Sequence, residues 1–72
     1  MLMAVKTGEK VKRYRRGNGL TQVELAVASG VAQSTIAEIE RGAIKEPRPR
    51  TLVKLAEVLG VTPMDLLDDL EG

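Results

Sequence analysis

The segment LTQVEL carries the strongest structural signal in the sequence and restricts how the chain around it can fold. Thr21 is followed three residues later by Glu24, which is the spacing of a capping box, where each side chain binds the backbone N–H of the other residue. Leu20 and Leu25 occupy the two positions of a hydrophobic staple around this cap. Both signals predict a helix over 21–28.

A second short helix is predicted directly afterwards, over about 33–41, and Gly42 closes it. Only residues 29–32, which include Gly30, separate the two helices. Two short helices joined by a turn of three or four residues containing Gly describe a helix-turn-helix. An ordinary αα-hairpin can show the same pattern, so at this point the second helix either has a merely solvated polar face or uses that face for recognition.

Three further helices are predicted from glycines, prolines and apolar spacing. The first begins at Thr7, a candidate N-cap, and ends near Arg16 at the glycines of GNG. The fourth runs over about 51–59, after a loop, AIKEPRPR, in which two prolines exclude a helix. The fifth begins at Pro63. We see no alternating strand pattern and expect an all-α fold of five helices.

The apolar positions of the predicted fifth helix are Met64, Leu67 and Leu70. We assign Leu67 to the core. Met64 and Leu70 are candidates for a dimer interface, and the alternative for both is the core.

The chain has 72 residues, which is enough for one small domain with a thin core. We therefore expect a single helix-turn-helix domain over residues 1–72, with its core at about 8–67, a short N-terminal tail and an acidic C-terminal tail. The opening MLMAV is far too short for a signal peptide, and either Met1 or Met3 could be the natural start. No apolar run approaches ~18 residues, so we expect no membrane span and a cytoplasmic protein.

Several classes of function lack the residues that they need. The sequence has no Cys and no His, so disulfides, thiolate metal sites and the commonest general base are excluded. No catalytic constellation, metal site, cofactor motif or small-molecule site is evident, and we expect no enzyme.

Charge is distributed unevenly along the chain. Residues 1–50 carry ten Lys or Arg and five Asp or Glu, whereas residues 51–72 carry one Lys and five Asp or Glu. Such asymmetry suggests an anionic partner for the basic part, although most charge clusters are only solvated surface.

Six linked motifs, GLTQ, A…G-V, QSTI, IERG, P…TL and LGV, occur in order along about residues 8–67. Together they resemble the Cro/C1-type (XRE-like) helix-turn-helix family, which includes the phage lambda and 434 repressors. The resemblance implies a compact five-helix domain with its helix-turn-helix at about 21–41. It also implies a sequence-specific transcriptional regulator, a repressor, that binds a palindromic double-stranded DNA operator as a homodimer.

In this family the third helix enters the major groove, which implies base contacts by Gln33, Ser34 and Glu38. A Gln amide can pair bidentately with adenine, and a Ser hydroxyl can donate or accept. Glu38 either accepts a hydrogen bond from cytosine N4 or weakens binding by repelling phosphates. The alternative for Gln33 and Ser34 is that they are merely polar residues at a helix start.

The resemblance also implies contacts to the DNA backbone, which position the protein without reading sequence. The residues concerned are Thr21, Gln22, Thr35, Arg41, Lys45, Arg48 and Arg50. Each exposed cation among them could equally be solvated surface.

Arg15 and Glu40 match a partly buried ion pair of the phage repressors, so the resemblance implies a structural role for both. Two other residues depart from the family pattern. Ala32 replaces the usual Ser or Thr cap of the third helix, a loss of about 1 kcal/mol. Tyr14 takes a position that is often Leu, so its hydroxyl needs a partner or water.

The rival hypothesis is a protein-interaction module, such as an antitoxin or an adaptor. The acidic segment DLLDDLEG at the end of the sequence could then dock a basic protein partner.

Overall fold

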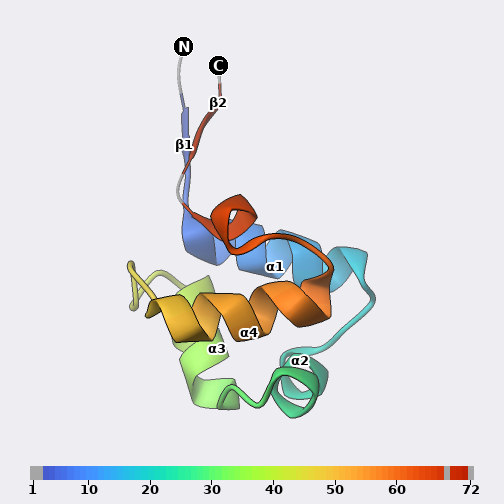
Figure 1. Cartoon of the computed structure of the whole chain (residues 1–72). Helices are drawn as coiled ribbons and strands as arrows, with labels where there is room; N and C mark the ends of the chain where they lie inside the picture. The colour runs from blue at the N-terminus through green and yellow to red at the C-terminus, as the bar shows by residue number, and fades with distance from the viewer. Residues whose placement is uncertain (1–2, 68, 72) are drawn as a thin grey trace.

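The computed structural model describes residues 3–67 and 69–71. Four α-helices form the body of the molecule, and they match the first four predicted helices (Figure 1). The elements in chain order are β1 (Met3–Val5), α1 (Thr7–Gly17), α2 (Gln22–Ser29), α3 (Gln33–Glu40), α4 (Pro49–Leu59), the 3₁₀ helix η1 (Pro63–Leu66) and β2 (Asp69–Glu71). In the described part of the chain, no helix combines the length and apolar character needed to cross a membrane.

The two short strands pair with each other and project away from the helices (Figure 1). They are antiparallel, with Met3 opposite Glu71 and Val5 opposite Asp69. The sequence shows no pattern for them, because three residues are too few to display the alternation that predicts a strand. Their pairing joins segments from opposite ends of the sequence.

The capping box of α2 is present as predicted. The backbone N–H of Glu24 donates to Thr21 Oγ1 at 3.1 Å, and the N–H of Thr21 donates to Glu24 Oε1 at 2.9 Å. The hydrogen bond from the backbone N–H of Thr21, together with the Thr21 hydroxyl, holds the pKa of the Glu24 carboxyl below its usual value. Gly30 ends the helix with a φ of 75°, a left-handed conformation that glycine adopts without steric cost.

Two predicted helix starts are displaced. Helix α4 begins at Pro49 rather than near Thr51. Proline suits the first position of a helix, because the backbone N–H that it lacks has no partner within the helix there and its fixed φ is helical. Helix α1 has Lys6 as its N-cap, and Thr7 is a buried first residue rather than the cap.

The predicted fifth α-helix is a single 3₁₀ turn, η1. Leu66 is fully buried there, whereas Leu67 is 47% exposed, so the assignment of Leu67 to the core is wrong. The chain leaves the helical path after one turn, so the α-helical spacing used for the assignment does not apply. Met64 is 78% exposed, and the side chain of Leu70 lies outside the described residues.

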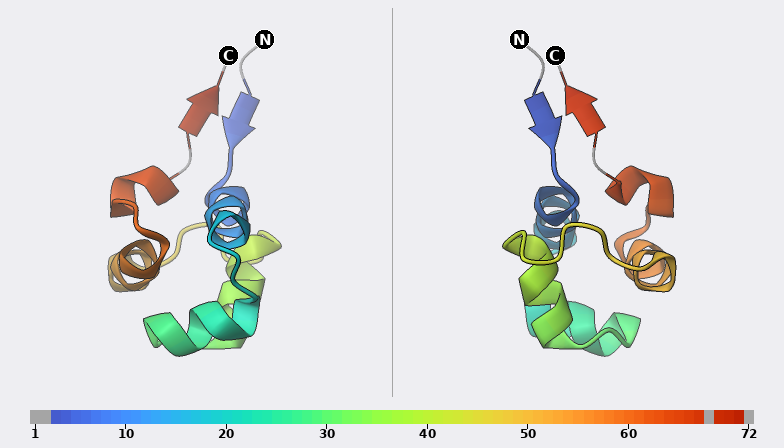
Figure 2. Two further views of the ribbon diagram at one scale, coloured as in Figure 1. Left: turned by 90° about the vertical axis from the view of Figure 1, so that its right-hand side faces the viewer. Right: turned by 90° about the vertical axis from the view of Figure 1, so that its left-hand side faces the viewer.

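The core is aliphatic and takes buried side chains from all four α-helices and from η1. The largest fully buried side chains are Val11, Leu25, Ile36, Ile39, Leu55 and Leu66. Tyr14, the single aromatic residue, packs against this cluster from α1. Figure 2 shows α3 and α4 on opposite sides of the molecule, with α1 above them and α2 below.

Helix α1 crosses the end of α3 at Gly8. A methyl group at this position would overlap the backbone carbonyl oxygen of Ile39 and would lie 3.1 Å from that of Glu40. Glycine is therefore required here by the close approach of two helices. This contact fixes α1 against the C-terminal end of α3.

Replacing Ala32 by Ser is expected to raise the free energy of unfolding by about 1 kcal/mol. Ala32 is the N-cap of α3 and forms no side-chain cap, although its φ of −59° and ψ of 139° suit a capping residue. Urea denaturation followed by circular dichroism measures the change. Thr21→Ala, which removes an existing cap, should lower stability by a similar amount. An unchanged midpoint for Ala32→Ser would contradict the expected cap.

Candidate nucleic-acid interface

Helix α3 has one buried and one outward face. Ile36 and Ile39 are fully buried, and at 100° per residue the opposite face carries Ser34 and Glu38. Gln33 and Ser34 are exposed and Glu38 is half-buried. Within the described part of the chain, none of these three polar side chains has a hydrogen-bonding or ionic partner. The outward face of α3 therefore offers free donors and acceptors at the start of a rigid helix.

The turn before α3 fixes its direction relative to α2. The backbone N–H of Val31 donates to Ser29 Oγ at 3.2 Å, and Val31 itself is buried. Together with the left-handed Gly30, these contacts turn the chain sharply between the two helices. Leu25 of α2 and Ile36 of α3 then pack into the same core.

Arg15 and Glu40, the two residues that the resemblance pairs, lie in direct contact. Arg15 Nε donates to Glu40 Oε2 at 2.7 Å, and Arg15 Nη2 donates to Oε1 at 2.9 Å. Arg15 Nη1 also donates to the carbonyl of Leu20 at 2.7 Å. One guanidinium thus joins α1, the segment before α2 and the end of α3.

Gln22, the first residue of α2, joins the same network. Its Nε2 donates to Glu40 Oε1 at 3.2 Å, so this carboxylate oxygen accepts from both Arg15 and Gln22. Burial raises the pKa of the Glu40 carboxyl, but hydrogen bonds from Arg15 and Gln22 outweigh it, and the pKa lies below its usual value. The bond to Glu40 raises the pKa of Arg15. Both groups are therefore charged at neutral pH.

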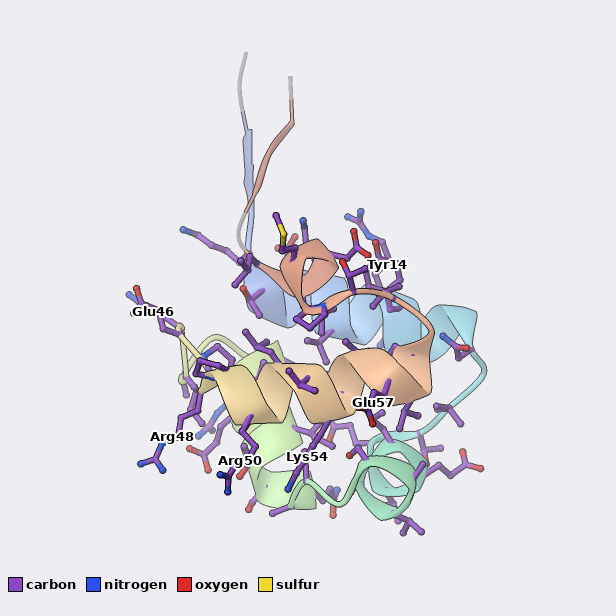
Figure 3. All side chains as sticks on the ribbon, in the orientation of Figure 1. Tyr14, Glu46, Arg48, Arg50, Lys54 and Glu57 are labelled. Carbon is purple, nitrogen blue, oxygen red and sulfur yellow. The ribbon has the colours of Figure 1, made fainter. Side chains whose placement is uncertain are left out.

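Cations lie on both sides of α3. On one side, a notch at the Arg15–Glu40 pair is also lined by Lys12, Arg16, Gln22 and Arg41. On the other side, Arg48, Arg50 and Lys54 extend from the start of α4 toward the side of the molecule where α2 and α3 lie (Figure 3). The outward face of α3 is thus flanked by two basic clusters.

The structure distributes the remaining predicted site residues over this surface. Thr21 is exposed but uses its hydroxyl in the capping box, and Thr35 is half-buried beside the loop that follows α3. The four predicted phosphate-contacting cations, Arg41, Lys45, Arg48 and Arg50, are all exposed.

Three basic residues near this surface, Lys12, Arg16 and Lys54, are not among the predicted site residues. Arg50 and Lys54 are four residues apart and share a face of α4, which the sequence could have indicated once the helix start at Pro49 was known. Lys12 and Arg16 are likewise four residues apart and share a face of α1, but the sequence does not show that this face meets the end of α3, where the notch lies.

Two short helices at a fixed angle, a glycine turn between them and a second helix with a free polar face define a helix-turn-helix domain. The chain belongs to the helix-turn-helix family HTH_3, whose family model matches residues 11–66. This membership confirms the resemblance found in the sequence motifs.

Among its relatives is the uncharacterized HTH-type transcriptional regulator RghRB of Bacillus subtilis. The two are 42% identical over 60 residues, which is 83% of this chain and 43% of RghRB. The chain therefore spans less than half the length of this relative.

Similar solved structures include proteins bound to DNA. SinR of Bacillus subtilis, described as a master regulator for biofilm formation and solved in complex with DNA, has a TM-score of 0.81 at 37% identity, covering 83% of this chain and 95% of that one. The P22 c2 repressor in complex with a synthetic operator has a TM-score of 0.80 at 27% identity, covering 88% and 94%. A complex of SinR with the protein SinI matches with a TM-score of 0.82 at 38% identity, covering 85% and 59%.

Proposed function

We propose that this chain is a sequence-specific double-stranded DNA-binding transcriptional regulator that acts as a repressor. It places α3 in the major groove of a palindromic operator as a homodimer, a function that would place it in the cytoplasm with its DNA target. The observation that carries the proposal is the free polar face of α3 between two basic clusters. The similar structures of SinR and the P22 c2 repressor, both solved with DNA, support it.

Base recognition is assigned to Gln33, Ser34 and Glu38. Gln33 and Ser34 lie in the first turn of α3, where side chains reach furthest into a groove in helix-turn-helix complexes. Glu38 lies one turn further on the same face and can accept a hydrogen bond from cytosine N4. Because Glu38 is adjacent to phosphates in this arrangement, its carboxylate disfavours sites that offer it no donor.

Phosphate contacts are assigned to Thr21, Gln22 and Thr35 and to the exposed cations Arg41, Lys45, Arg48 and Arg50. The two basic clusters flank α3, which is the arrangement needed to reach the two strands that border one major groove. Such contacts fix the protein on the duplex without selecting sequence. The unpaired backbone N–H groups at the start of α2 favour an anion as well.

The homodimer is assigned to the region of η1 and β2, through Met64 and Leu70. Met64 is 78% exposed and its neighbour Leu67 is 47% exposed, so η1 carries apolar surface that an identical copy can cover. A two-fold symmetric pair would present two copies of α3 to half-sites about one helical turn apart.

Selection from a random duplex pool tests the function directly. The chain is expected to enrich a palindrome, and log affinity for DNA should fall with log salt with a slope of several units as counterions are released. A chain that enriches no sequence would contradict the regulator assignment.

Gln33→Ala is expected to relax the enriched motif at one base position in each half-site, because a bidentate pair contributes roughly 1–3 kcal/mol of discrimination. Arg48→Ala is the matched comparison and should weaken binding to all sequences alike while lowering the salt slope by about 1. Binding selections with both variants provide the measurement. If the motif of Gln33→Ala equals that of the parent chain, Gln33 does not read a base.

A protein-interaction module is the second candidate, favoured by the complex of SinR with SinI. The acidic segment DLLDDLEG would then dock the partner. Asp65, the first residue of this segment, is already engaged, since its carboxylate accepts from the N–H and hydroxyl of Thr62 at 2.8 Å each. A chain that binds a protein partner but enriches no DNA sequence would support this candidate over the first.

A further inference from the structure

Glu40 contacts a residue that the proposed function places against DNA. Its Oε1 accepts from Gln22 Nε2 at 3.2 Å, while Arg15 occupies both carboxylate oxygens at 2.7 and 2.9 Å. The side chain of Glu40 is only 4% exposed, so it cannot itself reach a phosphate. It touches Gln22, which lines the notch together with Lys12, Arg16 and Arg41.

The hydrogen bond to Glu40 determines which edge of the Gln22 amide is available. A Gln amide has one acceptor oxygen and an NH₂ group with two donors, and the two ends have nearly the same shape. A carboxylate accepts only, so Glu40 binds the NH₂ end. With one N–H held in this way, the second N–H remains available to an anion in the notch. A rotated amide would instead turn its oxygen toward the anion and repel it.

The surroundings of the notch indicate an anion. Four basic residues line it, namely Lys12, Arg15, Arg16 and Arg41. The one carboxylate in the lining, that of Glu40, is paired with Arg15. Arg15 is in turn fixed by the carbonyl of Leu20. Arg15 therefore fixes the Glu40 carboxylate, and the carboxylate in turn binds the Gln22 amide.

We propose that Glu40 is a positioning residue for DNA binding, which orients the Gln22 amide so that an N–H faces a DNA phosphate seated in the notch. This inference rests on the proposed function and adds a role for Glu40 beyond its ion pair with Arg15. It predicts that the contributions of Glu40 and Gln22 to DNA affinity depend on each other.

A double-mutant cycle with Gln22→Ala and Glu40→Gln tests this dependence, using the enriched duplex and chains shown by circular dichroism to be folded. Glu40→Gln keeps the shape but replaces one acceptor oxygen by an NH₂ donor. Because Oε2 accepts from Arg15 Nε while Oε1 accepts from Arg15 Nη2 and Gln22, either orientation of the new amide sets an NH₂ group against a donor and disturbs the network that holds Gln22. In the parent chain it should lower DNA affinity about three- to tenfold, the size of one hydrogen bond. In the Gln22→Ala background it should cause no further loss.

The control cycle pairs Glu40→Gln with Gln33→Ala, which does not touch Glu40. In this cycle each substitution should lower DNA affinity by its own factor, and the double variant should lose affinity by the product of the two factors. If Glu40→Gln lowers affinity by the same factor with and without Gln22, Glu40 acts only through the fold and the positioning role is wrong. If the parent chain enriches no duplex, the proposed function itself fails, which is a different outcome.

A spectroscopic measurement on the parent chain remains decisive if Glu40→Gln does not fold. The two side-chain amide protons of Gln22 should differ in chemical shift and solvent exchange from those of a free Gln. Addition of the duplex should then shift the second proton. The proposal would be overturned if the Gln22 amide protons gave the signals of a free Gln side chain and did not shift when the duplex is bound.

Discussion

Arg15→Met is expected to lower the free energy of unfolding by about 3–5 kcal/mol at neutral pH, the usual cost of removing one member of a buried ion pair. Arg15 is 8% exposed and supplies three hydrogen bonds, two to Glu40 and one to the carbonyl of Leu20. Its loss leaves a buried carboxylate without its hydrogen-bonded counter-ion. Urea denaturation followed by circular dichroism measures the effect, which is a large fraction of the stability of a small domain.

Arg16→Met is the matched control, because Arg16 is the exposed neighbour in the same helix. Its change should stay within about 0.5 kcal/mol. Equal effects of the two substitutions would contradict a structural role for the Arg15–Glu40 pair.

The effect of Arg15→Met should shrink in acid. The pKa of the Glu40 carboxyl is lowered in the folded parent chain, so its contribution is present above the unfolded pKa and is lost as pH falls through the folded pKa. In Arg15→Met, protonation of Glu40 instead removes an unpaired buried charge, so the free energy of unfolding of the variant rises. The difference in stability between parent and variant should therefore begin to decrease above about pH 4.5, the ordinary value for this group, as Glu40 becomes protonated in the folded variant. It should decrease further below that pH as the parent chain loses its own contribution. A difference that grows in acid would contradict this account.

Gly8→Ala is expected to lower the free energy of unfolding by about 3 kcal/mol, the upper end of the usual range for overpacking. The added methyl group would overlap the backbone carbonyl oxygen of Ile39, which cannot move away as a flexible side chain could. Helix α1 must then shift against α3, which also strains the Arg15–Glu40 contact. Chemical denaturation gives the loss in stability.

Gly17→Ala provides the control within the same helix. A methyl group at Gly17 meets nothing within 4 Å, and Ala is favoured over Gly in a helix by roughly 0.5–1 kcal/mol. This variant should be slightly more stable than the parent chain. If both glycine variants lose stability equally, the close approach of α1 and α3 is not the cause.

The local parts of the fold could be predicted because their signals lie within a few residues of one another. Thr21 and Glu24 are three residues apart and form the predicted capping box. The limits of α2 and α3 follow from that cap, from Gly30 and from the apolar spacing. The pairing of Arg15 with Glu40 required the family resemblance, since 25 residues separate them.

The other features depend on contacts between distant segments or on small backbone differences. The need for glycine at position 8 arises only where α1 meets Ile39. The role of Gln22 in the Arg15–Glu40 network needed the relative position of α2 and α3. Leu66 rather than Leu67 enters the core because η1 is a 3₁₀ turn. The prolines of AIKEPRPR predict a break in any helix, whereas Pro49 instead occupies the first position of α4.

The packing of Tyr14 against the core has a practical consequence for measuring these effects. It is the only aromatic side chain in the sequence, so near-ultraviolet absorption and fluorescence report on a single place, the contact of α1 with the aliphatic cluster. Far-ultraviolet circular dichroism reports on all the helices at once. If both signals change at the same denaturant concentration, α1 leaves the core as the other helices unfold, and the domain behaves as one cooperative unit.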